Sequence, residues 1–248
     1  MRPALIALTA LLLPYKVSSQ QARNFPLESA AGLRVHNVTA EAVTLDGKRG
    51  VRLTVSPEVT RRLQALTPDQ LTQLAQRGSI EGVDLEQLAV IEGIDFSSGV
   101  IEAEIAGAPA PDAGAGARGF VGIGFRVQPD LRTYDAFYLR PTNGRAEDQE
   151  RRNHATQYIS HPDWPWFRLR QETPSKYESY VDLVPGVWTK IKIDVRGDKA
   201  RLYVNDNPQP VLIVNDVKSG ANGRGAVALW IGPGTIGHFR NVTVTPGQ

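Results

Sequence analysis

Two runs of alternating residues, 120–127 and 134–140, constrain the fold of this chain more than any other feature. In the first run Val121, Ile123, Phe125 and Val127 occupy odd positions, while Gly122, Gly124 and Arg126 occupy even positions. In the second run Tyr138 and Arg140 alternate with apolar neighbours. Because successive side chains of a β-strand point to opposite faces, each run predicts a strand with one face in a core. The other face would carry glycines, Arg and Tyr, which predicts a groove that binds hydroxylated or anionic ligands.

The rest of the chain also favours an all-β fold. Short alternating stretches, such as Val51–Val55, Val100–Ile105 and Trp188–Val195, are separated by turns rich in Gly, Asn, Asp and Pro. Many short strands of this kind predict a sandwich or a barrel. One set of outward positions is charged, as at Lys190 and Lys192, and indicates a solvated convex face. The other set includes Gly122 and Gly124 and indicates a concave face. This contrast favours a jelly-roll β-sandwich of two curved sheets.

Residues 57–77 interrupt the strand pattern. Val59 and Leu63 recur at helical spacing, and Thr67-Pro68 has the form of an N-cap followed by Pro at the first helical position. We therefore predict a short helical insertion here. It could be a lid over the groove, although a helix that covers one end of a sheet is the favoured interpretation.

Three later segments complete the expected organisation. Residues 106–118, rich in Ala, Gly and Pro, predict a loop between two strands. Residues 141–165 predict a long polar connection. In Trp166–Glu172, Phe167 and Leu169 alternate with arginines, which predicts another strand.

The amino terminus predicts export. Arg2 is followed by the apolar stretch Ala4–Leu13, which is too short to span a bilayer. Residues 1–19 therefore predict a signal peptide, and residues 20–248 a single β-sandwich domain that is secreted or periplasmic. No later segment has the ~20 apolar residues that a membrane helix needs, so no membrane span is expected.

The composition excludes several classes of protein. Of the 248 residues, 41% are hydrophobic and 22% are charged, which predicts a globular rather than a disordered chain. There is no cysteine, so disulfides and thiolate chemistry are excluded. The chain has 28 Lys and Arg against 26 Asp and Glu, and loss of Arg2 and Lys16 with the leader would make these numbers equal. This balance argues against a nucleic-acid partner bound through charge alone.

Residues 138–168 concentrate aromatic and hydrogen-bonding side chains beyond what a surface loop needs. Aromatic rings pack on the apolar faces of sugars, and Arg, Asn and Gln satisfy the hydroxyls. We therefore predict a carbohydrate or glycoside ligand; the alternative is that the segment packs on the edge of the sandwich. The predicted ligand-binding residues are Arg126, Tyr138, Arg140, Asn143, Arg152, Gln157, Tyr158, His161, Trp166, Arg168 and Trp230.

Catalysis is a second hypothesis for the same region. Asp148, His154 and Glu172 are the acid/base candidates because they flank the Arg-rich groove, where Arg neighbours would keep a carboxylate ionised. Glu102 and Glu104, two positions apart on one strand, have a spacing compatible with glycoside cleavage. A solvated outer face is nevertheless the favoured interpretation of that pair.

Neither a metal site nor a cofactor is predicted. The spacing of His154, His161 and Asp163 matches no dedicated zinc motif. The oxygens of Asn205-Asp206-Asn207 could hold a structural calcium ion, but an ordinary hairpin turn explains this segment better.

Four segments carry a resemblance to a known superfamily. They are Phe96-Ser97-Ser98-Gly99-Val100-Ile101-Glu102, Gly186-Val187-Trp188-Thr189-Lys190-Ile191, Ala200-Arg201-Leu202-Tyr203-Val204-Asn205 and His238-Phe239-Arg240-Asn241-Val242. With them the chain resembles the concanavalin A-like lectin/glucanase superfamily, in its laminin-G-like branch, and especially secreted bacterial proteins of the 3-keto-disaccharide hydrolase type.

This resemblance covers most of residues 85–245 and implies a β-sandwich in which structural calcium is common. It leaves three functions open: sugar binding on the concave sheet, hydrolysis of a (keto-)disaccharide or polysaccharide, and a non-catalytic protein-binding role in the cell envelope.

Overall fold

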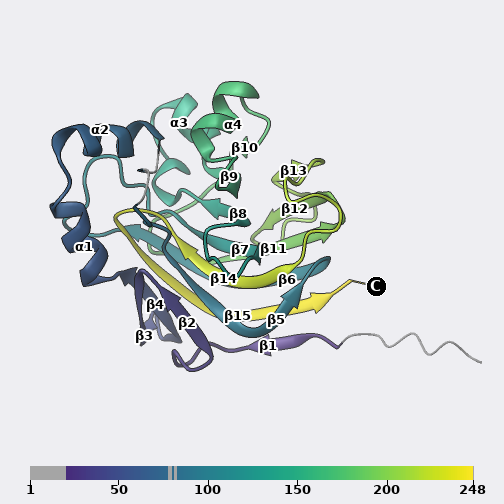
Figure 1. Ribbon diagram of the computed structural model, residues 1–248. Coiled ribbons are helices and arrows are strands. Elements are labelled where there is room, and N and C mark those ends of the chain that lie inside the picture. Colours follow the sequence, from purple (N-terminus) through teal and green to yellow (C-terminus); the bar gives the residue numbers. More distant parts are fainter. Residues whose placement is uncertain (1–20, 78–79, 81–82, 248) are drawn as a thin grey trace, which may run out of the picture.

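Two curved antiparallel β-sheets pack face to face in the computed structural model of this protein (Figure 1). The structure describes residues 21–77, 80 and 83–247. The predicted leader, residues 1–19, lies outside the described residues, so export stays a prediction. The two-sheet arrangement confirms the all-β jelly-roll sandwich that the sequence predicts.

The eight-stranded sheet has the order β13-β12-β11-β6-β15-β4-β3, with β1 paired to β15. In β11 the predicted alternation is confirmed, because Ile191, Ile193 and Val195 are buried while Lys190 is exposed. The strands of this sheet are β1 (Arg23–Phe25), β3 (Val38–Leu45), β4 (Lys48–Val55), β6 (Gly99–Pro109), β11 (Thr189–Arg196), β12 (Lys199–Val204), β13 (Leu212–Val214) and β15 (Thr235–Pro246).

The seven-stranded sheet has the order β10-β9-β8-β7-β14-β5-β2. Every residue of β7 and β8 is buried, so this sheet is covered on both faces: by the other sheet on one side, and by helices and loops on the other. Its strands are β2 (Leu33–His36), β5 (Leu88–Phe96), β7 (Val121–Val127), β8 (Tyr134–Leu139), β9 (Thr156–His161), β10 (Glu178–Ser179) and β14 (Gly225–Ile231).

The predicted helical insertion is confirmed as two helices, α1 (Pro57–Gln64) and α2 (Pro68–Arg77). The side chain of Ser56 caps α1 by accepting from the backbone N–H of Val59. Thr67 and Gln70 form a capping box at the start of α2, since each side chain accepts from the other residue's backbone N–H.

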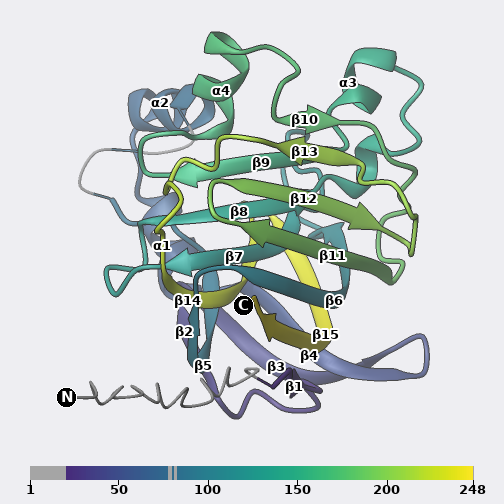
Figure 2. The ribbon, with the colours of Figure 1, turned by 90° about the vertical axis from the view of Figure 1, so that its right-hand side faces the viewer.

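Three short helices follow in the second half of the chain: η1 (Pro141–Asn143), α3 (Gln149–Asn153) and α4 (Trp166–Glu172). Figures 1 and 2 both show α2, α3 and α4 at the same end of the molecule, beyond β8 and β9. Segments far apart in the sequence therefore gather at one end of the seven-stranded sheet.

Two local predictions are wrong. Trp166–Glu172 is the helix α4 and not a strand, because Trp166, Leu169 and Arg170 also fit a helical period and Arg168 pairs with Glu172 one turn later. Residues 141–165 are not only a polar connection, because they include α3 and the strand β9, whose residues are buried except at its end.

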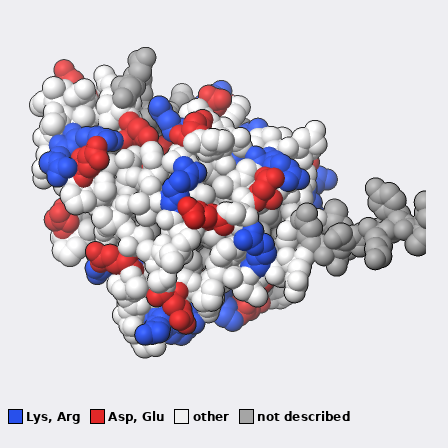
Figure 3. Space-filling view, turned by 60° about the horizontal axis from the view of Figure 1, so that its bottom comes forward, with Lys and Arg blue, Asp and Glu red and all other residues white. Residues whose placement is uncertain are grey.

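The described residues contain no helix that is both long and apolar enough to cross a membrane. On the face shown in Figure 3, basic and acidic side chains lie next to one another rather than in a patch of one sign. Exposed ion pairs such as Arg52–Glu41 and Arg145–Asp182 are of this mixed kind.

Candidate functional site

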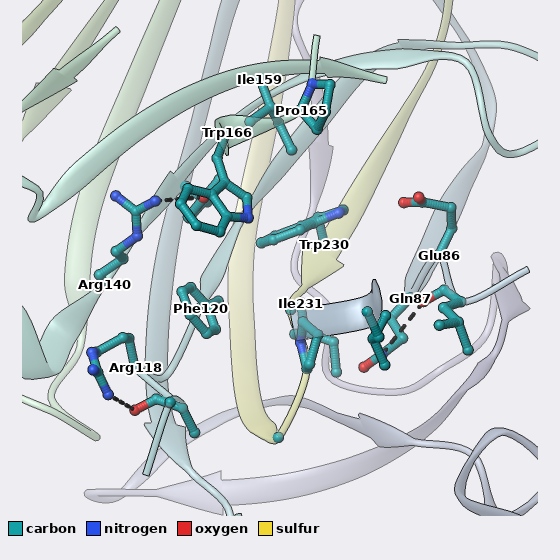
Figure 4. A pocket seen from close by; sticks show the side chains of 18 of the residues that line it. Glu86, Gln87, Arg118, Phe120, Arg140, Ile159, Pro165, Trp166, Trp230 and Ile231 are labelled. Atoms are coloured by element: carbon teal, nitrogen blue, oxygen red, sulfur yellow. Dashed lines mark hydrogen bonds between the residues drawn. The ribbon is translucent and has the colours of Figure 1, made fainter. Parts of the chain in front are cut away.

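A cavity of about 1210 Å³ lies over the outer face of the seven-stranded sheet. Its wall includes Leu63 of α1 and Leu71 and Leu74 of α2, so the helical insertion contributes to the cavity and does not only cover a sheet end. Figure 4 shows Arg118 and Arg140 at one side of the cavity and Glu86 and Gln87 at the other, with the aromatic rings of Phe120, Trp166 and Trp230 between them.

The floor of the cavity is formed by Trp230 and Tyr138, which belong to a row of residues paired across adjacent strands. Trp230 of β14 pairs with Gly122 of β7, which pairs with Tyr138 of β8; Gln157 of β9 and Glu178 of β10 continue the row. The rings of Trp230 and Tyr138 come from strands that are not neighbours, yet their centroids are 4.8 Å apart. They meet above Gly122, where a Cβ would lie 2.2 Å from the carbonyl oxygen of Phe137.

Arg140 is fixed in place beside this floor. Its Nη1 donates to the carbonyl oxygen of His154 at 3.0 Å and to Oε1 of Glu178 at 3.1 Å. Its Nη2 donates to Tyr138 Oη and to Gln157 Oε1, both at 2.9 Å. Four acceptors thus hold a buried guanidinium in one orientation, with Arg140 on the cavity wall.

Glu178 supplies the negative charge that pairs with Arg140 at this end of the cavity. It also accepts from Arg170 of α4, with Nε at 3.0 Å from Oε2, and His154 Nδ1 lies 2.8 Å from the same oxygen. Burial raises the pKa of Glu178, but Arg170, Arg140 and His154 together lower it below its ordinary value. Burial lowers the pKa of His154, and Arg170 and Arg140 lower it further, against the opposing effect of Glu178. Glu178 is therefore ionised and His154 neutral near pH 7.

Glu86 anchors the opposite end. Its Oε1 lies 2.9 Å from His161 Nδ1, and Tyr134 donates its hydroxyl hydrogen to Oε2. Trp230 Nε1 donates to the Tyr134 hydroxyl at 2.9 Å, which connects this end to the aromatic floor. Burial raises the pKa of Glu86, but His161, Tyr134 and Arg132 lower it overall, so this carboxyl is also ionised.

The structure brings most of the predicted site residues to this cavity. Gln157 lies under the wall, bonded to Arg140, and does not line the cavity. Those that line it are Tyr138, Arg140, Asn143, Asp148, His154, His161, Trp166 and Trp230.

Two predicted ligand-binding residues point the other way, toward the eight-stranded sheet. Arg126 has φ 55° and lies at a bulge in the β7–β14 pairing, which breaks the alternation and turns its side chain to the opposite face. It donates to the carbonyl oxygens of Ser97 and Gly197. Tyr158 is fully buried between the sheets and donates to Asp135 Oδ1 at 2.5 Å. Both residues support the core, and neither reaches the cavity.

Three more predicted residues lie outside the cavity. Arg168 and the catalytic candidate Glu172 pair with each other at 2.7 Å on the exposed side of α4, a position that the strand prediction could not have given. Arg152 donates to the hydroxyl of Tyr180 at 3.0 Å. Glu172 therefore does not line the cavity, unlike the other two acid/base candidates, Asp148 and His154.

Sequence reasoning missed several residues of the site, namely Glu86, Arg118, Phe120, Arg151, Arg170 and Glu178. Phe120 is two residues from Gly122 and so shares its side of the strand, and Arg170 follows Trp166 by one helical turn. The sequence therefore contained a pattern from which each of these two residues could have been predicted. Glu86 and Glu178 had none, because each is defined by partners distant in the chain.

The remaining candidates are unrelated to the cavity. Glu104 belongs to the eight-stranded sheet and bonds to Lys48 and Asn241, which supports the interpretation of a solvated outer face. In the turn at residues 205–207, Asp206 accepts from Lys190 at 2.8 Å. No group of three or more potential metal ligands occurs among residues 21–77, 80 and 83–247.

Comparison with known proteins supports the fold. No family model matches this chain, and no curated protein is significantly similar to it in sequence. Among solved structures, it is similar to a carbohydrate-binding module, CBM66, from Bacillus subtilis, with a TM-score of 0.52 and 12% identity over 86% of this chain and 95% of the module. It is also similar to a candidate glycosyl hydrolase from Parabacteroides distasonis, with a TM-score of 0.50 and 8% identity over 91% of this chain and all of the other. At such identities the likeness concerns the jelly-roll fold alone.

Proposed function

We propose that this protein is an exported carbohydrate-binding protein that holds a sugar or glycoside in the cavity over its seven-stranded sheet. The observation that carries the proposal is the floor, where Trp230 and Tyr138 form one apolar surface beside the fixed guanidinium of Arg140. A pyranose ring has an apolar face edged by hydroxyls, so it requires both elements side by side. Trp166 faces this floor from α4 and would cover the second side of the ring.

The charges of the two carboxylates that hold the ends of the cavity, Glu86 and Glu178, favour binding over hydrolysis. Hydrolysis by two carboxyl groups requires one of them to keep its proton near neutral pH, as a general acid. Glu86 and Glu178 are both ionised, and each is already held by hydrogen-bond donors. Such carboxylates orient their neighbours and accept from hydroxyls, but they are poor proton donors.

The test is a glycan panel probed with residues 20–248, followed by calorimetry on the sugars that bind. We expect Trp166→Ala to lower the affinity about tenfold, because it removes a stacking ring. Trp188→Ala is the matched control: Trp188 is also half-buried, but it donates to the carbonyl oxygen of Leu45 outside the cavity. A blank panel would reject sugar binding, and recovery of an envelope protein in its place would favour a protein-binding module.

Hydrolysis of a (keto-)disaccharide or polysaccharide is the alternative, because two of the acid/base candidates, Asp148 and His154, line the cavity. Asp148→Asn and His154→Gln should then abolish product release from a bound sugar while leaving its binding measurable. Glu172→Gln serves as the control, since this carboxylate lies outside the cavity. Turnover that survives both cavity variants would reject this assignment.

A further inference from the structure

Two arginines that line the cavity have only neutral partners. Arg118, in the loop before β7, donates Nη1 to the carbonyl oxygens of Ala115 at 2.6 Å and Ala117 at 3.0 Å. Arg151, on α3, donates Nε to Asn143 Oδ1 at 2.9 Å and Nη2 to Thr142 Oγ1 at 3.0 Å. In the part of the chain that the structure describes, no carboxylate lies within ion-pair distance of either guanidinium.

The other two arginines at this end share one carboxylate. Arg140 and Arg170 both bond to Glu178, so its single charge is divided between two cations. Asp148, the N-cap residue of α3, and Glu150 on α3 also line the cavity, but both are exposed to water. Asp148 Oδ1 is also bonded to the backbone N–H of Arg151. Four guanidiniums therefore face three carboxylates. Because Asp148 and Glu150 are exposed while Arg118, Arg151 and Arg170 are half-buried, the less exposed part of this end carries a positive excess.

The cations at this end repel one another. Burial lowers the pKa of Arg118, and the charges of Arg151 and Arg140 lower it further. Like charges in a partly desolvated site raise the free energy of the protein unless an anion lies between them. A guanidinium binds carboxylate or sulfate oxygens through paired N–H groups, which gives this arrangement a natural complement.

We propose that the ligand is an acidic saccharide, whose carboxylate or sulfate group binds between Arg118 and Arg151 while its ring lies on the floor formed by Trp230 and Tyr138. This inference rests on the proposed function, because it names the class of sugar for the same cavity. It goes beyond that function because a neutral sugar would leave both guanidiniums without a charged partner.

The experiment compares acidic oligosaccharides with neutral counterparts of equal length. One arm uses oligogalacturonates and their methyl esters, and the other uses sulfated carrageenan oligosaccharides and neutral agarose oligosaccharides. We expect an acidic member to bind at least about tenfold more tightly than its neutral counterpart, with an affinity that falls as salt is added. The arm that responds identifies the anionic group as carboxylate or sulfate.

Variants then locate the anionic group. Arg118→Gln and Arg151→Gln should each lower the affinity for the acidic sugar about tenfold and leave any binding of neutral sugars unchanged. Arg118→Lys should recover part of the affinity, because it restores the charge without the planar fork. Arg145→Gln is the control, since Arg145 is exposed and paired with Asp182 outside the cavity. Thermal unfolding of each variant separates a loss of folding from a loss of binding.

The outcomes distinguish the two proposals. If neutral sugars bind as tightly as acidic ones, or the Arg118 and Arg151 variants bind acidic sugars like the unaltered protein, the acidic-ligand inference is wrong and carbohydrate binding stands. If neither acidic nor neutral sugars bind, the proposed function itself fails.

Discussion

Gly122 shows how one missing side chain shapes the site. The rings of Tyr138 and Trp230 can touch only because the strand between them presents no Cβ at this position. A methyl group there would meet backbone atoms of β8, which cannot move as a flexible side chain does. The glycine is therefore part of the floor and not only a gap in it.

We expect Gly122→Ala to lower the free energy of unfolding by about 1–3 kcal/mol and to weaken ligand binding, because the strands must shift to admit the methyl group. Gly124→Ala is the matched control on the same face of β7, since its Cβ would lie 3.5 Å from the nearest atom, an ordinary contact. Urea unfolding monitored by tryptophan fluorescence measures the stability of both variants. Equal midpoints for the two variants would contradict this account of the floor.

Glu178 belongs to a buried ion pair and Glu172 to an exposed one, so the two residues allow the contributions of the pairs to be compared. The side chain of Glu178 is 3% exposed and that of Glu172 is 47% exposed, although each pairs with arginine. We expect Glu178→Gln to lower the free energy of unfolding by about 3–5 kcal/mol, because Arg140 would stay buried without its carboxylate. Glu172→Gln should change it by about 0–1 kcal/mol. Chemical denaturation of the two variants measures this difference. Similar losses of unfolding free energy would show that the buried ion pair contributes no more to stability than the exposed one.

At the scale of elements, α4 is the part of the site that depends most on tertiary contacts. It is a seven-residue helix, too short to be stable alone, and Pro165 at its N-cap makes no side-chain capping bond. Its one buried residue is Leu169, while Trp166 and Arg170 line the cavity. The packing of Leu169, together with the ion pair between Arg170 and Glu178, thus positions two residues of the candidate site.

We expect Leu169→Ala to lower the stability of this element by about 2–5 kcal/mol. Because Leu169 is the one buried residue of α4, the loss should appear first as faster amide hydrogen exchange in residues 166–172, with the sheets still protected. Gln171→Ala, an exposed position on the same helix, is the control. Unfolding of the whole protein at the same rate as α4 would contradict a local effect.

At the scale of the molecule, the buried titratable groups predict how stability depends on pH. Burial lowers the pKa of His154 and His238 below 6.5, so the unfolded chain takes up these protons first and stability falls as the pH drops below about 6.5. Glu86 and Glu178 have lowered pKa values, so their contribution is present above about 4.5 and is lost as the pH falls further. Asp135 opposes this second stage, because burial raises its pKa.

We therefore expect stability to decline in two stages on acidification, the first beginning below about pH 6.5 and the second below about pH 4.5. Urea midpoints measured across this range test the order of the stages. His238→Gln, which removes a histidine far from the cavity, should reduce the first stage only. A urea midpoint that stays constant from neutral pH down to about pH 4.5 would rule out the contribution of the histidines.

Period-two alternation determined the two-sheet fold, the inward residues of the strands, and the face shared by Gly122, Tyr138, Arg140 and Trp230. These features depend on residues that are close in sequence, because the backbone of a strand by itself sets the face to which each side chain points. Only the tertiary structure decided that Arg126 turns away at a bulge and that Trp166–Glu172 is a helix. It also decided that Glu178 and Glu86 hold the two ends of the cavity. A seven-residue segment fits either period, and a carboxylate is defined by the cations that the fold brings to it from elsewhere in the chain.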